Sequence, residues 1–378
     1  MKVLHISDLH AGKYLNNISR NQDLDFSLKR VIEICKEEKV KYVLISGDIF
    51  DRKKPDSLAI EIVNEFLVRL QELGVATVMI GGNHDDFDYL KAMKPFAKLA
   101  RVFIVDRPKG DISKAIVDLG DLCVACLPYP SPGVLTDLGE NISERERIYA
   151  NAISKYFQAL EYHTREKKPR ILMSHIFISG AKFGGGEISS TLSPEFSVPA
   201  SAIPYGFDYV ALGHLHKFQK IKEANSPTYY SGSLFQMDFG ESQEDKFVII
   251  VEFKDFVCDI REIRIPVYRN LVSITLNLED VNDQLFEKFN SSDLYKITLN
   301  IKKGQEFTKV ADILKSILGE RLVLRVEVET MLKRVENLEY RNKPLDSLYE
   351  IYLNENNTPN PEEYLLTFRR FLNEASKA

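Results

Sequence analysis

Five short apolar runs of this sequence each end in side chains of the types that bind metal ions. In chain order, the residues that follow these runs are Asp8 with His10, Asp48, Asn83 with His84 and Asp85, His175, and His214 with His216. In open α/β sheets, ligands bind in the crevice outside the carboxyl ends of the strands. If these runs are strands of a sheet, the sequence sends all of these side chains to one place.

Spacing within the two closest pairs supports a common cluster. Asp8 and His10, like His214 and His216, are two positions apart, and in an extended backbone such residues project to the same side. The leucine between the members of each pair is then free to point into the core. Glycines that allow tight backbone turns lie beside the same strand ends, at positions 47, 81, 82 and 213.

The distribution of histidines favours a functional cluster over a structural explanation. The chain has only 7 histidines, and most of them follow these apolar runs. The other two have ordinary roles: His5 lies inside a predicted strand as a hydrogen-bonded core residue, and His163 ends a charged helix, where solvent surrounds it.

The predicted ligands carry only nitrogen and oxygen donors, which excludes iron–sulfur clusters and cysteine–zinc sites. Seven side chains are too many for one ion but suit two ions that share a carboxylate. Two ions about 3.5–4 Å apart clamp both the attacking and the leaving oxygen of a phosphoryl transfer. Imidazole-rich ligation disfavours Mg²⁺ alone and suits Mn²⁺, Fe²⁺ or Zn²⁺. The seven side chains are Asp8, His10, Asp48, Asn83, His175, His214 and His216.

Alternating strand and helix patterns predict an α/β domain with a buried sheet over residues 1–265. Strands are expected at 2–7, 41–46, 75–80, 102–105, 114–118, 122–127, 170–174 and 208–213, and helices at 21–38, 57–73, 89–100 and 143–165. A β-α-β-α-β pattern over 266–330 indicates a small further domain, and the charged stretch 331–343 reads as a linker. Residues 344–378 hold two short amphipathic helices, too few residues for a core of their own, so their apolar faces must dock on this chain or on a partner.

Composition places the chain among soluble globular proteins. No apolar run is long enough to span a membrane and the N-terminus does not resemble a signal peptide, so a cytoplasmic location is expected. The net charge of −5 argues against a protein that coats DNA non-specifically but allows a local basic surface. Cys123 and Cys126 form a C-x-x-C inside a predicted buried strand, where packing is the expected role.

Taken together, the motifs D-x-H, G-D, G-N-H-D, H and G-H-x-H resemble those of the calcineurin-like metallophosphoesterases, over residues 1 to about 216. The resemblance implies a metallophosphoesterase sheet sandwich flanked by helices, with two metal ions. Asp8, His10 and His216 would hold the first ion, and Asn83, His175 and His214 the second. Asp48 would bridge them. His84 would protonate the leaving oxygen or stabilise the phosphate charge, with Asp85 orienting its imidazole.

The stretches "HISDLHAGK", "SGDIFDRKKP", "GGNHD" and "YYSGSLFQMDFGE" are similar to the bacterial SbcD-type nucleases, the counterparts of the meiotic-recombination-eleven nuclease. That family implies Mn²⁺-dependent cleavage of DNA, as a 3′–5′ exonuclease on duplex ends and an endonuclease on single strands and hairpins. It also implies a DNA-contacting capping domain, a C-terminal helical hairpin that binds an SMC-like ATPase of the SbcC type, and a homodimer formed through the helices near 56–73 and 89–100. One departure is Asp51, which stands where archaeal and eukaryotic relatives carry histidine.

Basic residues near the predicted mouth are candidates for holding phosphates: Lys13, Arg52, Lys53, Lys54, Lys182 and Lys217. Two alternatives remain. One is a phosphoesterase for a small nucleotide or a phosphoprotein, which would hydrolyse bis-(p-nitrophenyl) phosphate but no DNA. The other is a non-catalytic scaffold on the same fold, for which replacing His84 would leave activity unaltered.

Overall fold

The computed structural model describes residues 1–135, 142–167, 169–184, 196–242, 244–254, 257–302, 304–329, 345–355 and 360–375. Contacts divide the chain into two compact units, Met1–Ile301 with Gln305–Glu327, and Lys302–Gly304 with Val328–Ala378. Among the helices that the structure describes, none has the length and apolar character needed to cross a bilayer.

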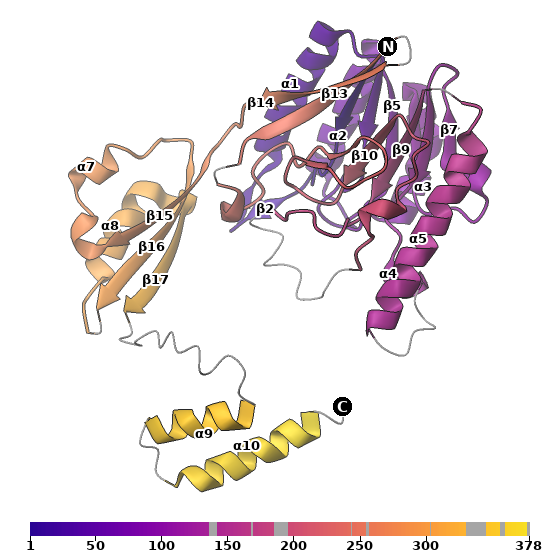
Figure 1. Cartoon of the computed structure of the whole chain (residues 1–378). Coiled ribbons are helices and arrows are strands. Elements are labelled where there is room, and N and C mark those ends of the chain that lie inside the picture. Colours follow the sequence, from indigo (N-terminus) through magenta and orange to yellow (C-terminus); the bar gives the residue numbers. More distant parts are fainter. Residues whose placement is uncertain are drawn as a thin grey trace. The chain divides into compact units, whose positions relative to one another are not determined.

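The first sheet has six strands in the order β14-β13-β1-β4-β5-β6. Figure 1 shows β14 and β13 side by side at one edge of this sheet. Strands β1, β4, β5 and β6 run parallel, and β13 joins β1 antiparallel. Three helices pack their apolar residues on one face of this sheet. The elements are β1 (Lys2–Ile6), β4 (Tyr42–Ile45), β5 (Ala76–Ile80), β6 (Val102–Val105), β13 (Lys246–Lys254), β14 (Val257–Ile265), α1 (Asn21–Glu38), α2 (Ser57–Glu72) and α3 (Phe87–Ala97).

The second sheet also has six strands, in the order β11-β12-β10-β9-β8-β7. Helix α5 (Ile142–Thr164) packs on its outer face. Its strands are β7 (Ile116–Asp118), β8 (Cys123–Leu127), β9 (Arg170–His175), β10 (Tyr209–Gly213), β11 (Gln219–Ile221) and β12 (Thr228–Tyr230). The short strands β2 (Tyr14–Leu15) and β3 (Ile18–Ser19) and the short helix α4 (Pro132–Leu135) lie outside the two sheets.

A shared core joins the inner faces of the two sheets, so the domain has helix, sheet, sheet and helix layers. Val3, Leu44 and Val78 of the first sheet and Val124, Met173 and Ala211 of the second belong to this core. The expected α/β class and the sheet sandwich flanked by helices that the resemblance implied are both confirmed. The strand pattern alone predicted one buried sheet, and that prediction is corrected to two sheets. Strands covered on both faces are near-continuous apolar runs, and such runs do not reveal which sheet they join.

Residues 271–329 form a three-stranded sheet in the order β15-β16-β17, with a core of its own. The elements are β15 (Leu271–Asn277), α7 (Asp283–Phe286), β16 (Leu294–Lys302), α8 (Thr308–Leu318) and β17 (Leu322–Glu329). The α+β pattern expected from the sequence is therefore present, and the division of the chain at 265 and 330 stays a prediction. The predicted linker 331–343 lies outside the described residues.

Two helices at the C-terminus, α9 (Leu345–Glu355) and α10 (Pro361–Ala375), pack against each other. The rings of Tyr349 and Phe368 lie 4.4 Å apart between centroids. An ion pair of 3.1 Å joins Arg369 Nε to Asp346 Oδ2. Both helices predicted for this tail, and their pairing, are thus seen.

Candidate metal centre

The side chains singled out in the sequence converge from both sheets. Strands β1, β4 and β5 of the first sheet and β9 and β10 of the second end at the same cluster. Among the described residues, three groups of side chains could each hold an ion, because the potential ligand atoms within each group lie within 4.8 Å of one another. They are Asp8 with His10 and His216, His10 with Asp48 and His84, and Asp8 with Asp48 and His175.

Two imidazoles face each other on one side of the cluster. The Nε2 atoms of His10 and His216 lie 3.2 Å apart. Each ring uses its other nitrogen on a carboxylate: His10 Nδ1 lies 3.2 Å from Asp51 Oδ1, and His216 Nδ1 lies 3.0 Å from Glu241 Oε1. A carboxylate acceptor holds each Nδ1 as the protonated nitrogen and leaves the Nε2 lone pair for a cation.

The other side of the cluster is built around Asn83. Its Oδ1 lies 2.9 Å from His175 Nε2 and 3.0 Å from His214 Nδ1. Asp48 lies between the two sides, because its Oδ2 is 3.3 Å from His175 Nε2 and 3.6 Å from His10 Nε2. The structure therefore brings all seven predicted ligands together, with the predicted bridging carboxylate in the middle.

The donor set fits divalent cations. Asp8, His10, Asp48 and His175 are almost fully buried, and buried charges need a partner or a metal ion. All donors are nitrogen or oxygen, as Mn²⁺, Fe²⁺ and Zn²⁺ accept. Cys123 and Cys126, in contrast, are buried in strand β8, where burial raises the pKa of the Cys123 thiol to about 11. The packing role expected for the C-x-x-C agrees with this placement.

Electrostatic coupling in the cluster is strong even without a cation. Burial disfavours the charged imidazole of His175, but the Asp48 carboxylate, together with Asp8 and the Ser46 carbonyl, outweighs burial and raises the pKa of His175 to about 9. Burial likewise opposes ionisation of Asp48, yet the His175 charge holds the pKa of Asp48 well below its usual value. The two groups thus form a buried ion pair, which a divalent ion would have to open by displacing a proton.

Several of the proposed ligands have a backbone conformation with positive φ. Asp8, His10 and Asp48 have φ of 52°, 44° and 49°, and His214 has φ of 103°. Non-glycine residues rarely occupy this region, and such strain gathers at functional sites. The expectation that extended backbone aligns the two pairs is therefore wrong, although each pair does reach the cluster. The leucines at 9 and 215 are buried, as the same expectation required.

Two glycines leave room that any side chain would fill. A Cβ on Gly47, which has φ of +94°, would lie 2.3 Å from His175 Nδ1. A Cβ on Gly82 would lie 2.1 Å from Asp48 Oδ1. The G-D and G-N-H-D motifs therefore need glycine because the ligands of neighbouring loops approach the backbone closely.

His84 stands at the edge of the cluster. Its ring centroid is 4.8 Å from that of His10, and its backbone N–H donates to Asp48 Oδ1 at 2.9 Å. The Nδ1 of His84 lies 2.9 Å from the carbonyl oxygen of Asp51. Because a carbonyl only accepts, Nδ1 carries a hydrogen and Nε2 is the nitrogen left for proton transfer.

The structure places Asp85 differently from the expectation that it orients His84. Its carboxylate accepts from the backbone N–H groups of Gly82, Ile49 and Phe50, at 2.8, 3.2 and 3.0 Å. Burial and the nearby Asp48 charge raise the pKa of Asp85 to about 7 against these three donors. Asp85 therefore ties the two ligand loops together, and the carbonyl of residue 51 holds the imidazole.

Two further acidic residues, Asp51 and Asp86, have defined hydrogen-bond partners. Asp51 accepts from His10 and pairs with Lys13 Nζ at 3.0 Å. Burial opposes its ionisation, but His10 and Lys13 outweigh burial and lower its pKa to about 2. Asp86 is the N-cap of α3 and accepts from the N–H groups of Asp88 and Tyr89. The predicted helix began at 89, and that late start hid the cap.

Sequence reasoning missed Glu241 altogether. Its stretch, "FGE", resembled the nuclease family, but nothing in the pattern ties a carboxylate to a histidine 25 residues away. Glu241 is fully buried. Burial opposes its ionisation, but the Lys246 charge and the His216 imidazole lower its pKa to about 2.

The predicted phosphate-holding residues divide into two kinds. Lys13 and Lys217 are engaged in ion pairs, with Asp51 at 3.0 Å and Glu244 at 3.2 Å. The remaining four are exposed, namely Arg52, Lys53, Lys54 and Lys182, and of these Arg52 also lies with its Nε 3.8 Å from Asp51 Oδ2. The guanidinium of Arg52 lies 5.8 Å from the Tyr14 ring centroid.

Comparison with known proteins agrees with this geometry. Residues 1–218 match the calcineurin-like phosphoesterase family, and the chain belongs to that family. More narrowly, it is similar to the SbcD subunit of the nuclease SbcCD from Bacillus subtilis (strain 168), with 32% identity over 260 residues. The similarity to the SbcD type seen in the motifs is thereby confirmed. This alignment covers 67% of the chain and 66% of the relative, slightly less than two thirds of its length.

A similar solved structure is a dimetal phosphatase from Danio rerio, with a TM-score of 0.45 and 10% identity. The match covers 70% of this chain and 95% of the phosphatase.

Proposed function

We propose that this chain is a metal-dependent phosphodiesterase that acts on DNA, as the nuclease component of an SbcCD-type repair complex. The observation that carries the proposal is the convergence of Asp8, His10, Asp48, His175 and His216 on one buried point, in a chain similar to the SbcD subunit of a nuclease. Apolar side chains would stabilise the contact between these distant loops better than buried charged groups do, so the fold alone does not account for the cluster.

We propose that the seven ligands would hold two divalent cations, preferably Mn²⁺, and that Asp48 would be a ligand of both. Asp8, His10 and His216 hold one ion, and Asn83, His175 and His214 hold the other. When bound, such ions lower the pKa of a water and neutralise charge on phosphate. The carboxylates accepting from His10 and His216 fix the ligand rings in advance.

His84 is proposed to protonate the leaving oxygen or to stabilise the charge on the phosphate. Its Nδ1 is engaged by the Asp51 carbonyl, so the protonated ring can donate only through Nε2. Its backbone N–H holds Asp48, so proton transfer and the shared ligand depend on one short loop. Asp85 keeps that loop in place by accepting from Gly82 N–H.

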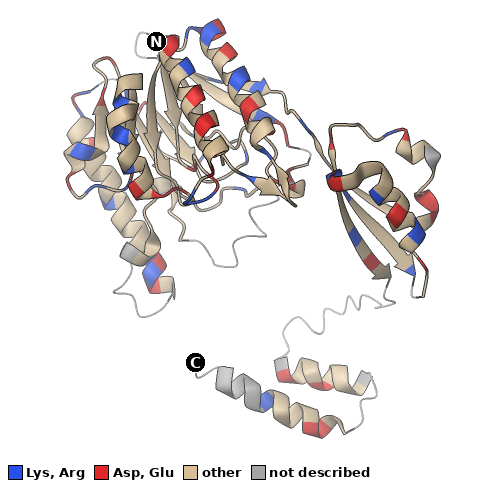
Figure 2. Ribbon diagram, turned by 180° about the vertical axis from the view of Figure 1, so that it is seen from behind, with Lys and Arg blue, Asp and Glu red and all other residues tan. Residues whose placement is uncertain are grey.

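The DNA substrate is supported by the relative and by local charge. On helices α1 and α5, Lys and Arg are interspersed with Asp and Glu (Figure 2), in keeping with the net charge of −5. We therefore propose that individual exposed cations near the cluster, such as Arg52, Lys53 and Lys182, contact the DNA phosphates, and not a uniformly basic surface. Cleavage of duplex ends in the 3′–5′ direction and of single strands and hairpins internally is the proposed activity.

The hairpin of α9 and α10 is the proposed docking site for an SbcC-type ATPase. Tyr352, Tyr364 and Leu366 expose 58%, 51% and 70% of their surface, an apolar excess typical of a helix that meets a partner. A homodimer through the phosphoesterase domain and residence with the nucleoid in the cytoplasm belong to the same proposal.

An Mn²⁺-dependent assay on end-labelled duplex and hairpin DNA tests the proposal, with His84→Ser as the matched variant. Shortening of the duplex from its 3′ ends and nicking of the hairpin, both lost in the variant, are expected. Hydrolysis of bis-(p-nitrophenyl) phosphate without cleavage of any DNA would favour a small substrate instead. Equal activity of the variant and the wild type would favour a scaffold.

A further inference from the structure

Glu241 is a buried carboxylate that points at one of the proposed ligands. It is the last residue of the short 3₁₀ helix Phe239–Glu241, and its side chain is fully buried. Its Oε1 lies 3.0 Å from Nδ1 of His216. Its Oε2 accepts from the Met237 N–H at 3.1 Å and contacts Lys246 Nζ at 2.6 Å. One oxygen is therefore anchored to the protein, and the other is directed at the imidazole.

Lys246 completes this arrangement. Its side chain is 2% exposed, and its Nζ also donates to Ser233 Oγ at 2.9 Å. A buried lysine of this kind is stable only beside a negative charge. The ion pair with Lys246 fixes the rotamer of Glu241 and keeps its carboxylate ionised. An ionised carboxylate is a stronger acceptor for a histidine Nδ1–H than a neutral group is.

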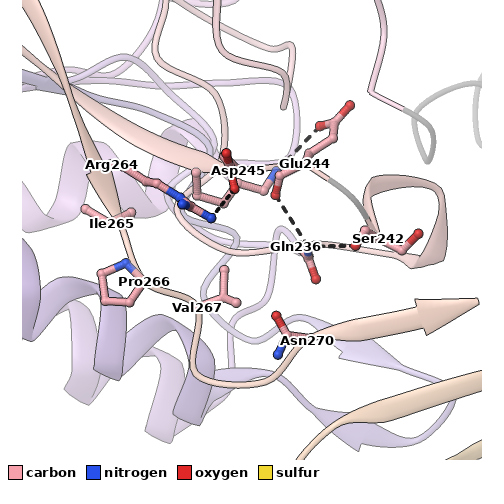
Figure 3. Close-up of a pocket in the computed structure, with 10 residues that line it drawn as sticks. Gln236, Ser242, Glu244, Asp245, Arg264, Ile265, Pro266, Val267 and Asn270 are labelled. Carbon is pink, nitrogen blue, oxygen red and sulfur yellow. Dashed lines mark hydrogen bonds and ion pairs between the residues drawn. The ribbon is translucent and has the colours of Figure 1, made fainter.

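The turn that carries Glu241 is itself braced. Gln236 Nε2 donates to the carbonyls of Ser242 and Glu244, at 3.2 and 3.4 Å, and its Oε1 accepts from the Leu271 N–H at 2.8 Å. Figure 3 shows Gln236, Ser242 and Glu244 on the wall of a pocket of about 460 Å³, which Lys246 also lines. Hydrogen bonds from Gln236 on the C-terminal side of Glu241 thus help to fix its position.

We infer that Glu241, held by Lys246, is a positioning residue that keeps His216 in the tautomer with its lone pair on Nε2, toward His10. This inference rests on the proposed function, in which His216 binds a metal ion. Carboxylates that accept from a ligating histidine orient the ring and raise its basicity, and their loss typically weakens metal binding about 10–100-fold.

Two double variants separate this role from simple support of the fold. Glu241→Leu with Lys246→Met removes the carboxylate and the buried cation together, so neither is left facing a missing partner. Glu244, whose Oε2 lies 3.8 Å from Lys246 Nζ, keeps its ion pair with Lys217 at 3.2 Å in both variants. Glu241→Gln with Lys246→Met keeps an oxygen that can accept from His216 Nδ1–H. Thermal unfolding of the metal-free proteins checks that both fold like the wild type.

The measurements are the Mn²⁺ dissociation constant by electron paramagnetic resonance and the His216 tautomer by ¹⁵N NMR of the metal-free protein. The leucine variant is expected to bind Mn²⁺ about 10–100-fold more weakly and to lose the fixed tautomer, and the glutamine variant to recover both in large part. Wild-type affinity and tautomer in a folded leucine variant would overturn the inference alone. A wild type that binds no Mn²⁺ would instead overturn the proposed function beneath it.

Discussion

The Nε2 atoms of His10 and His216 lie 3.2 Å apart, although 206 residues separate the two histidines in the chain. Both Nδ1 atoms are engaged by carboxylates, those of Asp51 and Glu241. Each ring therefore presents an acceptor to the other, and two facing lone pairs repel unless a cation lies between them. The protein holds the rings in this position through their outer partners, which is an arrangement prepared for a metal ion.

Replacing His216 with Ala is expected to weaken Mn²⁺ binding by at least about tenfold, because a ligand is lost and His10 faces a gap. His163→Ala is the matched control, since His163 is exposed on α5 and its described contacts, with the Ala159 carbonyl and the Tyr162 ring, lie within its own helix. Isothermal titration with Mn²⁺ measures both. Equal affinities of the two variants would contradict the assignment of His216 as a ligand.

Replacing His84 with Ser is expected to lower the rate of phosphodiester hydrolysis about 10²–10⁴-fold while the Mn²⁺ affinity stays close to that of the wild type. The reason is that His84 directs Nδ1 to the Asp51 carbonyl, and its backbone N–H to Asp48 survives the substitution. Single-turnover kinetics on labelled DNA and Mn²⁺ titration are run on the same preparation. A parallel loss of affinity would make His84 a ligand rather than a proton donor.

Much of the centre could be predicted because its ligands share one signal, a polar residue at the end of an apolar run. His5 was also predictable as a core residue: its Nδ1 and Nε2 lie 2.9 and 3.1 Å from Tyr209 Oη and Ser46 Oγ, and burial lowers its pKa to about 3. The predicted bounds of an element agree with the structure where the apolar periodicity extends over many residues, as in α1, predicted and found at 21–38.

The parts that escaped prediction depend on partners distant in sequence. Nothing local says that Glu241 accepts from His216, or that the Asp51 carbonyl rather than Asp85 meets His84. The positive φ of Asp8 was likewise hidden, because non-glycine residues adopt it only when the surrounding structure imposes it. Spacing alone suggested an extended pair, and tertiary contacts decided otherwise.

Replacing Gly82 with Ala is expected to destabilise the protein by about 1–3 kcal/mol and to weaken Mn²⁺ binding. The added Cβ would lie 2.1 Å from Asp48 Oδ1 and 2.3 Å from Asp48 N, so the shared carboxylate must move. Gly110→Ala is the control, because a Cβ there meets nothing within 4 Å. Urea unfolding without metal and Mn²⁺ titration give the two quantities. Indistinguishable glycine variants would show that the loop yields without disturbing Asp48.

The stability of the fold is expected to depend on acid pH through Asp106, which follows strand β6 and is not a proposed ligand. The side chain of Asp106 is 1% exposed. It pairs with Lys94, with Lys109 Nζ at 2.8 Å and with Arg107 Nε at 3.0 Å. Burial opposes its ionisation, but the two lysines outweigh burial and lower the pKa of Asp106 to about 2.

Because the folded-state pKa of Asp106 lies below the value of 3.8 for an unperturbed carboxyl, the ionised form stabilises the fold above about pH 4, and this contribution fades as the pH falls toward 2. Asp106→Asn should therefore lower the free energy of unfolding by about 2 kcal/mol at pH 6 and by clearly less at pH 3. Urea unfolding at both pH values measures the difference. Asp88→Asn is the control, since Asp88 is 84% exposed and a surface pair contributes little. A difference between Asp106→Asn and the wild type that stayed constant from pH 6 to pH 3 would mean that packing, not charge, is what the substitution disturbs.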